Sequence, residues 1–434
     1  MTAATPPATT RPSPPGSGWL MWAIPAFIFL IAFFHRAAPG VIARELMQAF
    51  GATGAIVGLL SATYFYAYAG LMVPAGLLVD AFGARRVVAA GGAVMGLGTL
   101  AMGAALTQGV LFAGRLAVGL GASVTFVGAL KIAATWFPPA EFGTLAALTA
   151  TMGLLGALAA TAPLAALVAA VGWRGAFGVV AWLTLASAAA CWWVVRDRPD
   201  ASGEPAAVGP GLRAVLAGAG QVLRNPHTWP PFLTFFWLYA ANANLMLWVV
   251  PYLRDVYGLP TTDAALYATG TSLALLVAGP LTGFVSDRLV HRRKLPYAIL
   301  NGSLFALAVV LVLTLGALPL WGVYGLFFGM GLVGAGFVLT WPIGREVNPP
   351  HLAGVAVAVV NMGGFLGAAL TQGLIGAVLD AHWTGALVGG ARVYPVEAYR
   401  AAFSACALFI LASALTALCL RETRGQNVYA AQRR

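Results

Sequence analysis

Long stretches of apolar residues, separated by short polar segments, extend through almost the whole chain. A transmembrane α-helix needs about 20 mostly apolar residues, whereas a strand of a transmembrane barrel needs about 10 residues of alternating polarity. The stretches here are long and do not alternate, so they indicate helices. The pattern predicts an all-α integral membrane protein with twelve transmembrane helices, near residues 19–43, 54–79, 87–107, 109–136, 143–169, 175–195, 228–252, 263–286, 295–317, 321–345, 353–380 and 398–420.

Composition excludes an ordinary soluble fold. Of the 434 residues, 60% are hydrophobic, and only 24 are Lys or Arg and 13 are Asp or Glu, whereas about a quarter of a soluble domain is charged. The net charge of +11 does not indicate nucleic-acid binding, because the cations lie between apolar stretches instead of gathering on one face. Cys191, Cys406 and Cys419 lie in apolar stretches without metal-ligand spacing, so we expect them to be packing residues and predict no metal site.

The longest polar interruption divides the twelve helices into two sets of six. The predicted organisation is a disordered cytoplasmic tail 1–18, an N-terminal half 19–195, a cytoplasmic linker 196–227, a C-terminal half 228–420 and a C-terminal tail 421–434. With the N-terminus inside, most basic residues fall in the inner segments, and the outer segments hold only Arg44, Arg174, Arg254, Arg392 and Arg400. Since short cytoplasmic loops are enriched in Lys and Arg, we expect both termini in the cytoplasm of a multi-pass protein of the cell membrane, the inner membrane in bacteria.

An internal repeat supports two pseudo-symmetric halves. Gly, Asp and two Arg follow the second helix and recur with constant spacing after the eighth, as Gly76, Asp80, Arg85 and Arg86 and as Gly283, Asp287, Arg292 and Arg293. Paired glycines of the fourth and tenth helices repeat in the same order. Duplicated halves are common in secondary transporters, which bind substrate near the membrane midplane between the repeats.

The segment 76–86 resembles the signature between helices 2 and 3 of the major facilitator superfamily, and Arg115 to Gly119 resembles its second motif, in helix 4. This resemblance covers nearly the whole chain and implies a carrier working by alternating access. It further implies a latch that closes the cytoplasmic side when the carrier faces outward, formed by Asp80, Gly83, Arg85, Arg86, Asp287, Arg292 and Arg293. An alternative is that the basic residues only set topology. Segments 36–40, 64–68 and 361–365 resemble a branch that contains bacterial permeases of unassigned substrate and lysosomal dipeptide carriers.

Few ionisable side chains fall well inside the predicted spans, and the candidates are His35, Arg36, Arg115 and Lys131. Such residues are costly in a membrane and are functional candidates by default. The acidic residues Asp80, Asp287, Glu346 and Asp380 fall at helix ends. Because no Asp or Glu lies well inside a span, we expect an electropositive cavity that binds an organic anion or a carboxylate-bearing zwitterion. Arg36 is the predicted anchor; the alternative is that it snorkels to water or pairs with Glu45. Lys131 either lines the cavity or snorkels to the cytoplasm.

Aromatic and amide side chains are candidates to complete the pocket. Tyr64 and Tyr68 share one face of the second helix, and Tyr239 and Asn242 lie near the middle of the seventh. Asn361 lies in the eleventh helix, and a buried amide needs a partner from another helix or a ligand. The alternative for each residue is a hydrogen bond between helices.

The sequence therefore favours a membrane transporter of a small molecule, a secondary active or facilitative carrier that acts as a monomer in the lipid bilayer. No catalytic, nucleotide-binding or metal motif is found, so neither enzymatic activity nor a cofactor is expected. Two alternatives stay open: a proton-coupled carrier or exporter of a neutral or hydrophobic solute, and a non-transporting sensor on a carrier fold. For proton coupling, His35 is the titratable candidate, and family resemblance adds Arg115.

Overall fold

The apolar stretches fold into twelve helices long enough to cross a membrane in a computed structural model that describes residues 17–138, 141–198 and 212–430. In the N-terminal half these are α1 (Ser17–Val41), α3 (Gly54–Phe82), α4 (Ala84–Gly103), α5 (Gln108–Ala122) continued by α6 (Thr125–Trp136), α7 (Phe142–Ala159) and α8 (Ala162–Val194). Thr53 and Thr107 start α3 and α5 by accepting a backbone N–H of the first turn, which satisfies a donor that the helix leaves unpaired.

The C-terminal half repeats this arrangement. Its helices are α10 (Trp229–Tyr257), α11 (Thr261–Phe284) with the π-helical turn η3 (Val285–Val290), α12 (Lys294–Thr314), α13 (Leu320–Gly334) with η4 (Ala335–Leu339) and α14 (Thr340–Glu346), α15 (Ala353–Ala381) and α16 (Val396–Leu418). The fourth span of each half is broken near its middle, in α5–α6 and in α13–α14. The predicted fold, twelve spanning helices in two six-helix halves, is confirmed.

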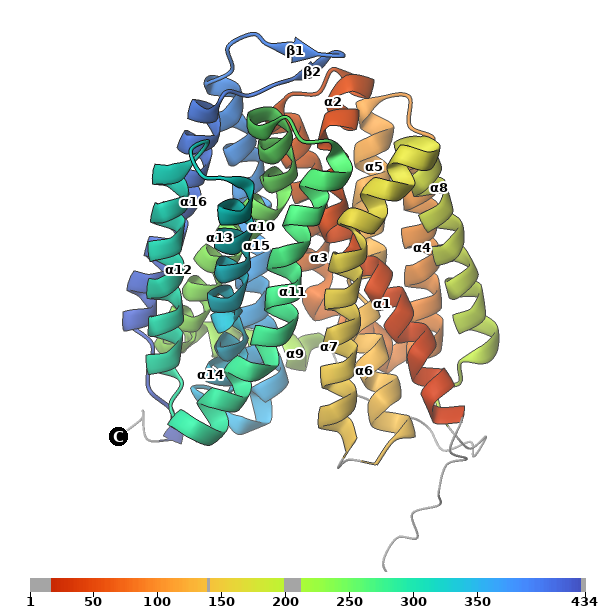
Figure 1. Cartoon of the computed structure of the whole chain (residues 1–434). Helices are drawn as coiled ribbons and strands as arrows, with labels where there is room; N and C mark the ends of the chain where they lie inside the picture. The colour runs from red at the N-terminus through yellow and green to blue at the C-terminus, as the bar shows by residue number, and fades with distance from the viewer. Residues whose placement is uncertain (1–16, 139–140, 199–211, 431–434) are drawn as a thin grey trace, which may run out of the picture.

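Four short elements lie outside the spans and identify the two ends of the bundle. The helix α2 (Ala43–Phe50) and the antiparallel pair β1 (Leu387–Val388) and β2 (Ala391–Arg392) lie together at one end, called here the hairpin end (Figure 1). The helix α9 (Leu212–Arg224) lies at the other, the linker end (Figure 1), and the turn η2 (Pro226–Thr228) leads from there into α10. None of these four elements was predicted from the hydropathy pattern, because each is too short or too polar to form a span.

The boundary between the fifth and sixth spans is a sharp reversal within α8. Gly172 has φ +71°, a left-handed conformation that favours glycine, so the chain turns there. The part of α8 before Gly172 continues α7 toward the hairpin end, and the part after it returns toward the linker end (Figure 1). This agrees with predicted spans 143–169 and 175–195. Most of the predicted tail 1–18, the centre of the linker and the last four residues lie outside the described residues.

The two halves meet chiefly along α3 and α15, with further contacts of α1 with α10 and of α11 with α7 and α8. Near the hairpin end the α3 and α15 backbones approach so closely that a Cβ on Gly376 would meet the carbonyl of Gly54. Small residues permit such an approach between helices in a membrane. The halves are therefore tightly joined at the hairpin end.

Candidate functional site

The central cluster is built around Arg36, which extends from α1 at the interface between the halves. The guanidinium Nε donates a hydrogen bond of 3.4 Å to the hydroxyl of Tyr64. Tyr64 lies ten residues into α3, roughly 15 Å from the hairpin end of that helix. This distance is about half the 30 Å thickness of a hydrocarbon core, so the Arg36 guanidinium lies well inside the bundle and not at the hairpin end.

Four aromatic rings surround the Arg36 guanidinium. Its central carbon lies 3.8 Å from the ring centre of Phe33, 4.7 Å from that of Tyr68, 4.8 Å from that of Phe365 and 5.8 Å from that of Tyr64. Phe365 belongs to α15 of the other half, so this cation–π contact joins the halves. Arg36 remains partly exposed, and among the described residues no carboxylate pairs with it. The predicted alternative of a pair with Glu45 is wrong, since Glu45 pairs with Arg254 at 3.3 Å.

A second cation, Arg115, lies deeper in the N-terminal half. It is fully buried, and its Nη1 donates a hydrogen bond of 2.8 Å to the carbonyl of His35. Its guanidinium carbon lies 5.0 Å from the ring centre of Tyr64, while Nε and Nη2 have no hydrogen-bond partner among the described residues. The His35 ring is fully buried and lies 3.1 Å from the hydroxyl of Thr99 on α4. Both candidate coupling residues therefore lie inside the N-terminal half, behind Tyr64.

The other predicted pocket residues fall at the same interface. Tyr239 of α10 packs against Phe65 and Phe365, with ring centres 6.0 Å and 5.6 Å apart. Asn361 of α15 accepts a hydrogen bond of 3.1 Å from the indole N–H of Trp341. Asn242 is partly exposed, three residues beyond Tyr239 on α10. The structure thus brings together Arg36, Tyr64, Tyr68 and Tyr239, with the two asparagines on the neighbouring C-terminal helices.

Lys131 is not part of this cluster. It lies near the linker end of α6, where its ammonium pairs with Asp80 at 2.6 Å and half of its side chain is exposed. The salt bridge joins two helices of the same half. Lys131 therefore belongs with Asp80 in the motif at the linker end of α3 and does not line the site around Arg36.

The latch motifs of both halves are held within their own half at the linker end. Gly83 has φ +85°, and the backbone N–H of Arg85 donates a hydrogen bond of 2.8 Å to Asp197. In the C-terminal half Arg293 pairs with Asp287 and, at 3.2 Å, with Glu346. Burial alone would lower the pKa of Arg293, but Glu346 and Asp287 outweigh it and raise the pKa above its usual value. Arg86 and Arg292 are exposed.

These two ion pairs differ in their expected effect on stability. The Lys131→Gln substitution removes a solvent-exposed pair, so the free energy of unfolding should fall by at most about 1 kcal/mol. The matched Arg293→Gln substitution removes the buried partner of buried Glu346, which keeps the Thr423 hydroxyl and a 3.9 Å contact to exposed Arg345, and should cost about 3 kcal/mol or more. Thermal unfolding of the detergent-purified variants measures both. Equal losses in the two variants would contradict this assignment.

The hairpin end is closed by Asp380, near the end of α15. Its Oδ1 accepts hydrogen bonds from the Gly54 N–H at 2.9 Å, the Tyr394 hydroxyl at 2.7 Å and Arg392 Nη1 at 2.9 Å. Its Oδ2 accepts from the Ala55 N–H at 2.8 Å. A carboxylate is favourable at the N-terminus of a helix, here the 29-residue α3. Asp380 therefore binds one half of the protein to the other.

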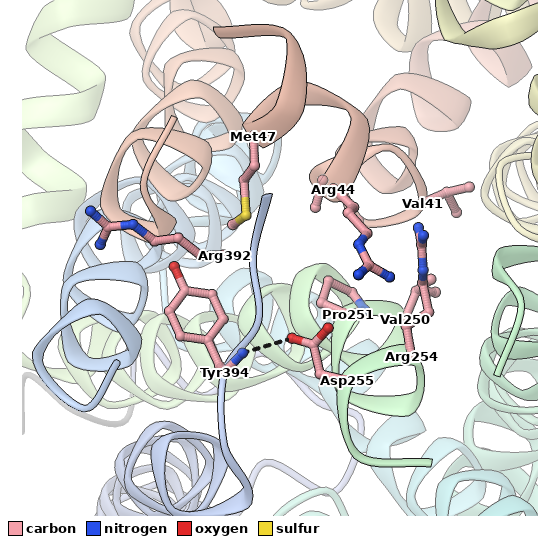
Figure 2. A pocket seen from close by; sticks show the side chains of 11 residues that line it. Val41, Arg44, Met47, Val250, Pro251, Arg254, Asp255, Arg392 and Tyr394 are labelled. Atoms are coloured by element: carbon pink, nitrogen blue, oxygen red, sulfur yellow. Dashed lines mark hydrogen bonds between the residues drawn. The ribbon is translucent and has the colours of Figure 1, made fainter. Parts of the chain in front are cut away.

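A second set of contacts supports this closure and surrounds a very small pocket between α1, α2, α10 and the segment after β2 (Figure 2). In Figure 2 the Tyr394 N–H donates to Asp255, and the Arg44 side chain extends from α2 toward the same carboxylate. Burial raises the pKa of Tyr394 above its usual value, and its hydrogen bond to Asp380 raises it further, so the phenol remains a donor. With the pair of Arg254 and Glu45, charged contacts join the halves across this end.

Sequence reasoning missed the residues that complete these sites. Phe365 belongs to segment 361–365 of the family resemblance but is not among the predicted pocket residues, although it contacts Arg36 from the opposite half. Asp380 falls at the end of the predicted span 353–380, yet a carboxylate at the end of one span can cap the start of another. The available signal in the sequence was a carboxylate at the end of an apolar stretch.

Comparisons with known proteins agree with this architecture. The family model of the Major Facilitator Superfamily matches residues 26–372. The probable sulfoacetate transporter SauU of Cupriavidus necator is 25% identical over 276 residues, which cover 61% of this chain and 64% of that protein. The membrane sensor protein UhpC of Salmonella typhimurium is 25% identical over 392 residues, 85% of each chain. A crystal structure of a bacterial homolog of the human lysosomal transporter Spinster, inward-facing and unoccupied, has a TM-score of 0.78 at 16% identity, covering 93% of this chain and 97% of that one.

Proposed function

The chain belongs to the Major Facilitator Superfamily, and on that premise we propose that it carries a small organic anion across the membrane by alternating access. Its family and the transporters among its relatives make it a membrane transporter of a small molecule and not an enzyme. The observation that carries the choice of substrate is Arg36, a partly exposed guanidinium well inside the bundle between the halves, without a carboxylate partner among the described residues.

The charge argument follows from the cost of an unpaired cation in a membrane. A guanidinium near the bilayer centre is destabilised unless an anion or a ring of dipoles compensates it. The rings around Arg36 compensate in part, and an arriving carboxylate or sulfonate can add hydrogen bonds to both terminal nitrogens. The name of the relative SauU, a probable sulfoacetate transporter, supports an anionic substrate.

The tyrosines give this anchor its geometry. Tyr64 accepts a hydrogen bond from Arg36 and donates one of 3.0 Å to the carbonyl of Ala32, so it fixes the guanidinium against α1. Tyr68 stacks on Tyr64 with ring centres 5.9 Å apart. We assign substrate contact to Arg36, Tyr68, Tyr239, Asn242 and Asn361, with Tyr64 as a positioning residue. Lys131 is assigned to the gate with Asp80, while His35 and Arg115 remain candidates for proton coupling.

The conformation described here is assigned as inward-facing. Polar contacts between the halves are concentrated at the hairpin end, while the latch residues at the linker end contact their own half. The excess of basic residues at the linker end supports placing that end, and both termini, in the cytoplasm. Substrate would then reach Arg36 from the cytoplasm, and an outward-facing state would require the Asp380 contacts to break.

Transport in sealed proteoliposomes tests the proposal. Vesicles with the full chain should exchange at least one external labelled organic anion, from a panel that includes sulfoacetate and phenylacetate, for the same unlabelled anion inside, and labelled glucose should not enter. Protein-free vesicles are the control. If neither anion nor any other organic anion of a wider panel exchanges, the proposed function is wrong. Binding without exchange would favour the alternative of a sensor, the activity named for the relative UhpC.

A further inference from the structure

The C-terminal half presents a continuous group of aromatic rings beside Arg36, called here the aromatic wall. From Phe365, 4.8 Å from the guanidinium carbon, the ring centres follow one another at 5.6 Å to Tyr239 and 5.5 Å from Tyr239 to Phe235. Phe337 and Trp341 complete the wall, 5.9 Å and 6.2 Å from Phe235 and 5.6 Å from each other. Three helical segments of one half, α10, η4–α14 and α15, supply these five rings.

Part of this wall is accessible although it lies inside the bundle. Tyr239, Phe337 and Trp341 are partly exposed, whereas Phe235 and Phe365 are buried behind them. The exposed rings lie on the side of Arg36 toward the linker end, since η4 and α14 lead to the linker end of their span. A ligand that reaches Arg36 from that end therefore passes along aromatic surface.

The polar groups beside the wall are few, and most are engaged with the protein. Trp341 donates its indole N–H to Asn361, whose own amide donates to the sulfur of Met72 at 3.8 Å. The side chain of Asn242, which is partly exposed, makes no hydrogen bond among the described residues. A polyhydroxylated acid would exchange many hydrogen bonds to water for one amide and the tyrosine hydroxyls, which is unfavourable.

The charge at the site is equally limited. Arg36 is the partly exposed cation of the cluster, while Arg115 is fully buried behind the ring of Tyr64. A dianion could pair one charge with Arg36, but its second charge would lie against aromatic surface without a partner. Such desolvation is costly, so the cluster favours a single negative charge.

From these contacts we infer that the substrates are aromatic monoanions, with a carboxylate on Arg36 and a planar ring packed on Tyr239, Phe337 and Trp341. This inference rests on the proposed anion site and narrows it to arylacetate-like compounds. Aromatic pairs contribute about 0.5–1.5 kcal/mol beyond the burial of their area, a factor of about two to ten in affinity. Ring planarity, and not apolar size alone, should therefore determine selectivity.

Isothermal titration calorimetry of the purified full chain tests this with matched probes. Phenylacetate and indole-3-acetate should bind about threefold to tenfold more tightly than cyclohexylacetate, which has the same charge and a non-planar ring. They should bind more than tenfold more tightly than D-glucarate or nitrate. The uncharged 2-phenylethanol, which lacks the carboxylate, should bind at least tenfold more weakly than phenylacetate.

Substitutions at Trp341 connect the selectivity to the wall. Trp341→Leu should raise the Kd of phenylacetate about threefold to tenfold and leave that of cyclohexylacetate within about twofold, whereas Trp341→Phe should restore most of the preference. Trp321→Leu, at a side chain that is 79% exposed on α13, is the matched control and should change neither Kd. Phe337→Leu is a second variant if Trp341→Leu does not fold.

The outcomes separate this inference from the function on which it rests. Equal binding of phenylacetate and cyclohexylacetate, tighter binding of glucarate or nitrate, or no binding of any probe would overturn the aromatic class. If glucarate or nitrate binds and Arg36→Gln removes that binding, the anion site stands without its aromatic preference. If 2-phenylethanol binds as tightly as phenylacetate and Arg36→Gln changes neither, the proposed anion transport itself is wrong.

Discussion

The Arg36→Gln substitution is expected to lower the kcat/KM of organic anion uptake at least a hundredfold. A charge-assisted hydrogen bond contributes about 1.5–3 kcal/mol, and two from the guanidinium to one carboxylate would account for that factor. Glutamine is shorter than arginine and keeps one amide donor group, but it has no charge. Arg36→Lys should retain part of the activity, because it keeps the charge without the planar pair of donors. Initial rates of labelled phenylacetate uptake in proteoliposomes give the comparison.

The control for Arg36 is Arg400, an exposed residue in the first turns of α16. Arg400→Gln changes the net charge by the same amount and should leave uptake within about twofold. Folding of each variant is checked by its elution as a single species in detergent and by its unfolding temperature. Full uptake by a folded Arg36→Gln variant would mean that the anion is bound elsewhere.

The second large effect is expected from Asp380→Asn, which should shift the protein from the inward-facing state toward the outward-facing state. The substitution removes the negative charge that accepts from Gly54, Ala55, Arg392 and Tyr394. Charge-assisted hydrogen bonds of this kind contribute about 1.5–3 kcal/mol each, and Asn can retain some of them. A net loss of about 3 kcal/mol would change the ratio of the two states by roughly a hundredfold.

Distances between pairs of spin labels, obtained by double electron–electron resonance, measure this shift. Labels at Leu106 and Ala317, exposed at the hairpin end in different halves, should move apart in Asp380→Asn. Labels at Glu141 and Leu289, exposed at the linker end, should move closer together. Asp263→Asn, at an exposed carboxylate in the first turn of α11, makes the same chemical change and should leave both distances unchanged. Unaltered distances in Asp380→Asn would show that the carboxylate does not hold the hairpin end closed.

Equivalent residues of the repeat illustrate why only part of these sites could be predicted from the sequence. Asp80 lies in the last turn of α3 and Asp287 in η3, which follows α11, so the two residues occupy the corresponding positions that the repeat predicts. Their partners differ: Asp80 pairs with Lys131 of another helix, whereas Asp287 pairs with Arg293 six residues further on. The duplicated motif indicates where a charged group lies, but the neighbouring helices decide what it contacts.

In the central cluster, too, the position of the charged residue could be predicted but not all of its contacts. That Arg36 lies within a span without an acidic residue nearby could be predicted, because the cost of charge in a bilayer makes each intramembrane cation conspicuous in the sequence. Its aromatic environment could be predicted only in part, because Tyr64 and Tyr68 are among the expected pocket residues, whereas the contacts of Phe33 and Phe365 follow from how α1 and α15 pack. Likewise, the sequence offers Glu45 as the alternative partner of Arg36, while the actual partner of Glu45 is Arg254.

The sequence by itself determined the membrane-spanning class, the twelve helices, their division into halves and the basic character of the middle of the bundle. These properties are local, because a spanning segment in hydrocarbon must satisfy its backbone hydrogen bonds within itself. The apolar composition of the segment is therefore enough to predict a helix. Only the tertiary structure decided which end is closed and which groups meet. The bonds of Gly54 to Asp380 and Tyr394 join residues 326 and 340 positions apart, and such contacts depend on how closely α3 and α15 can pack.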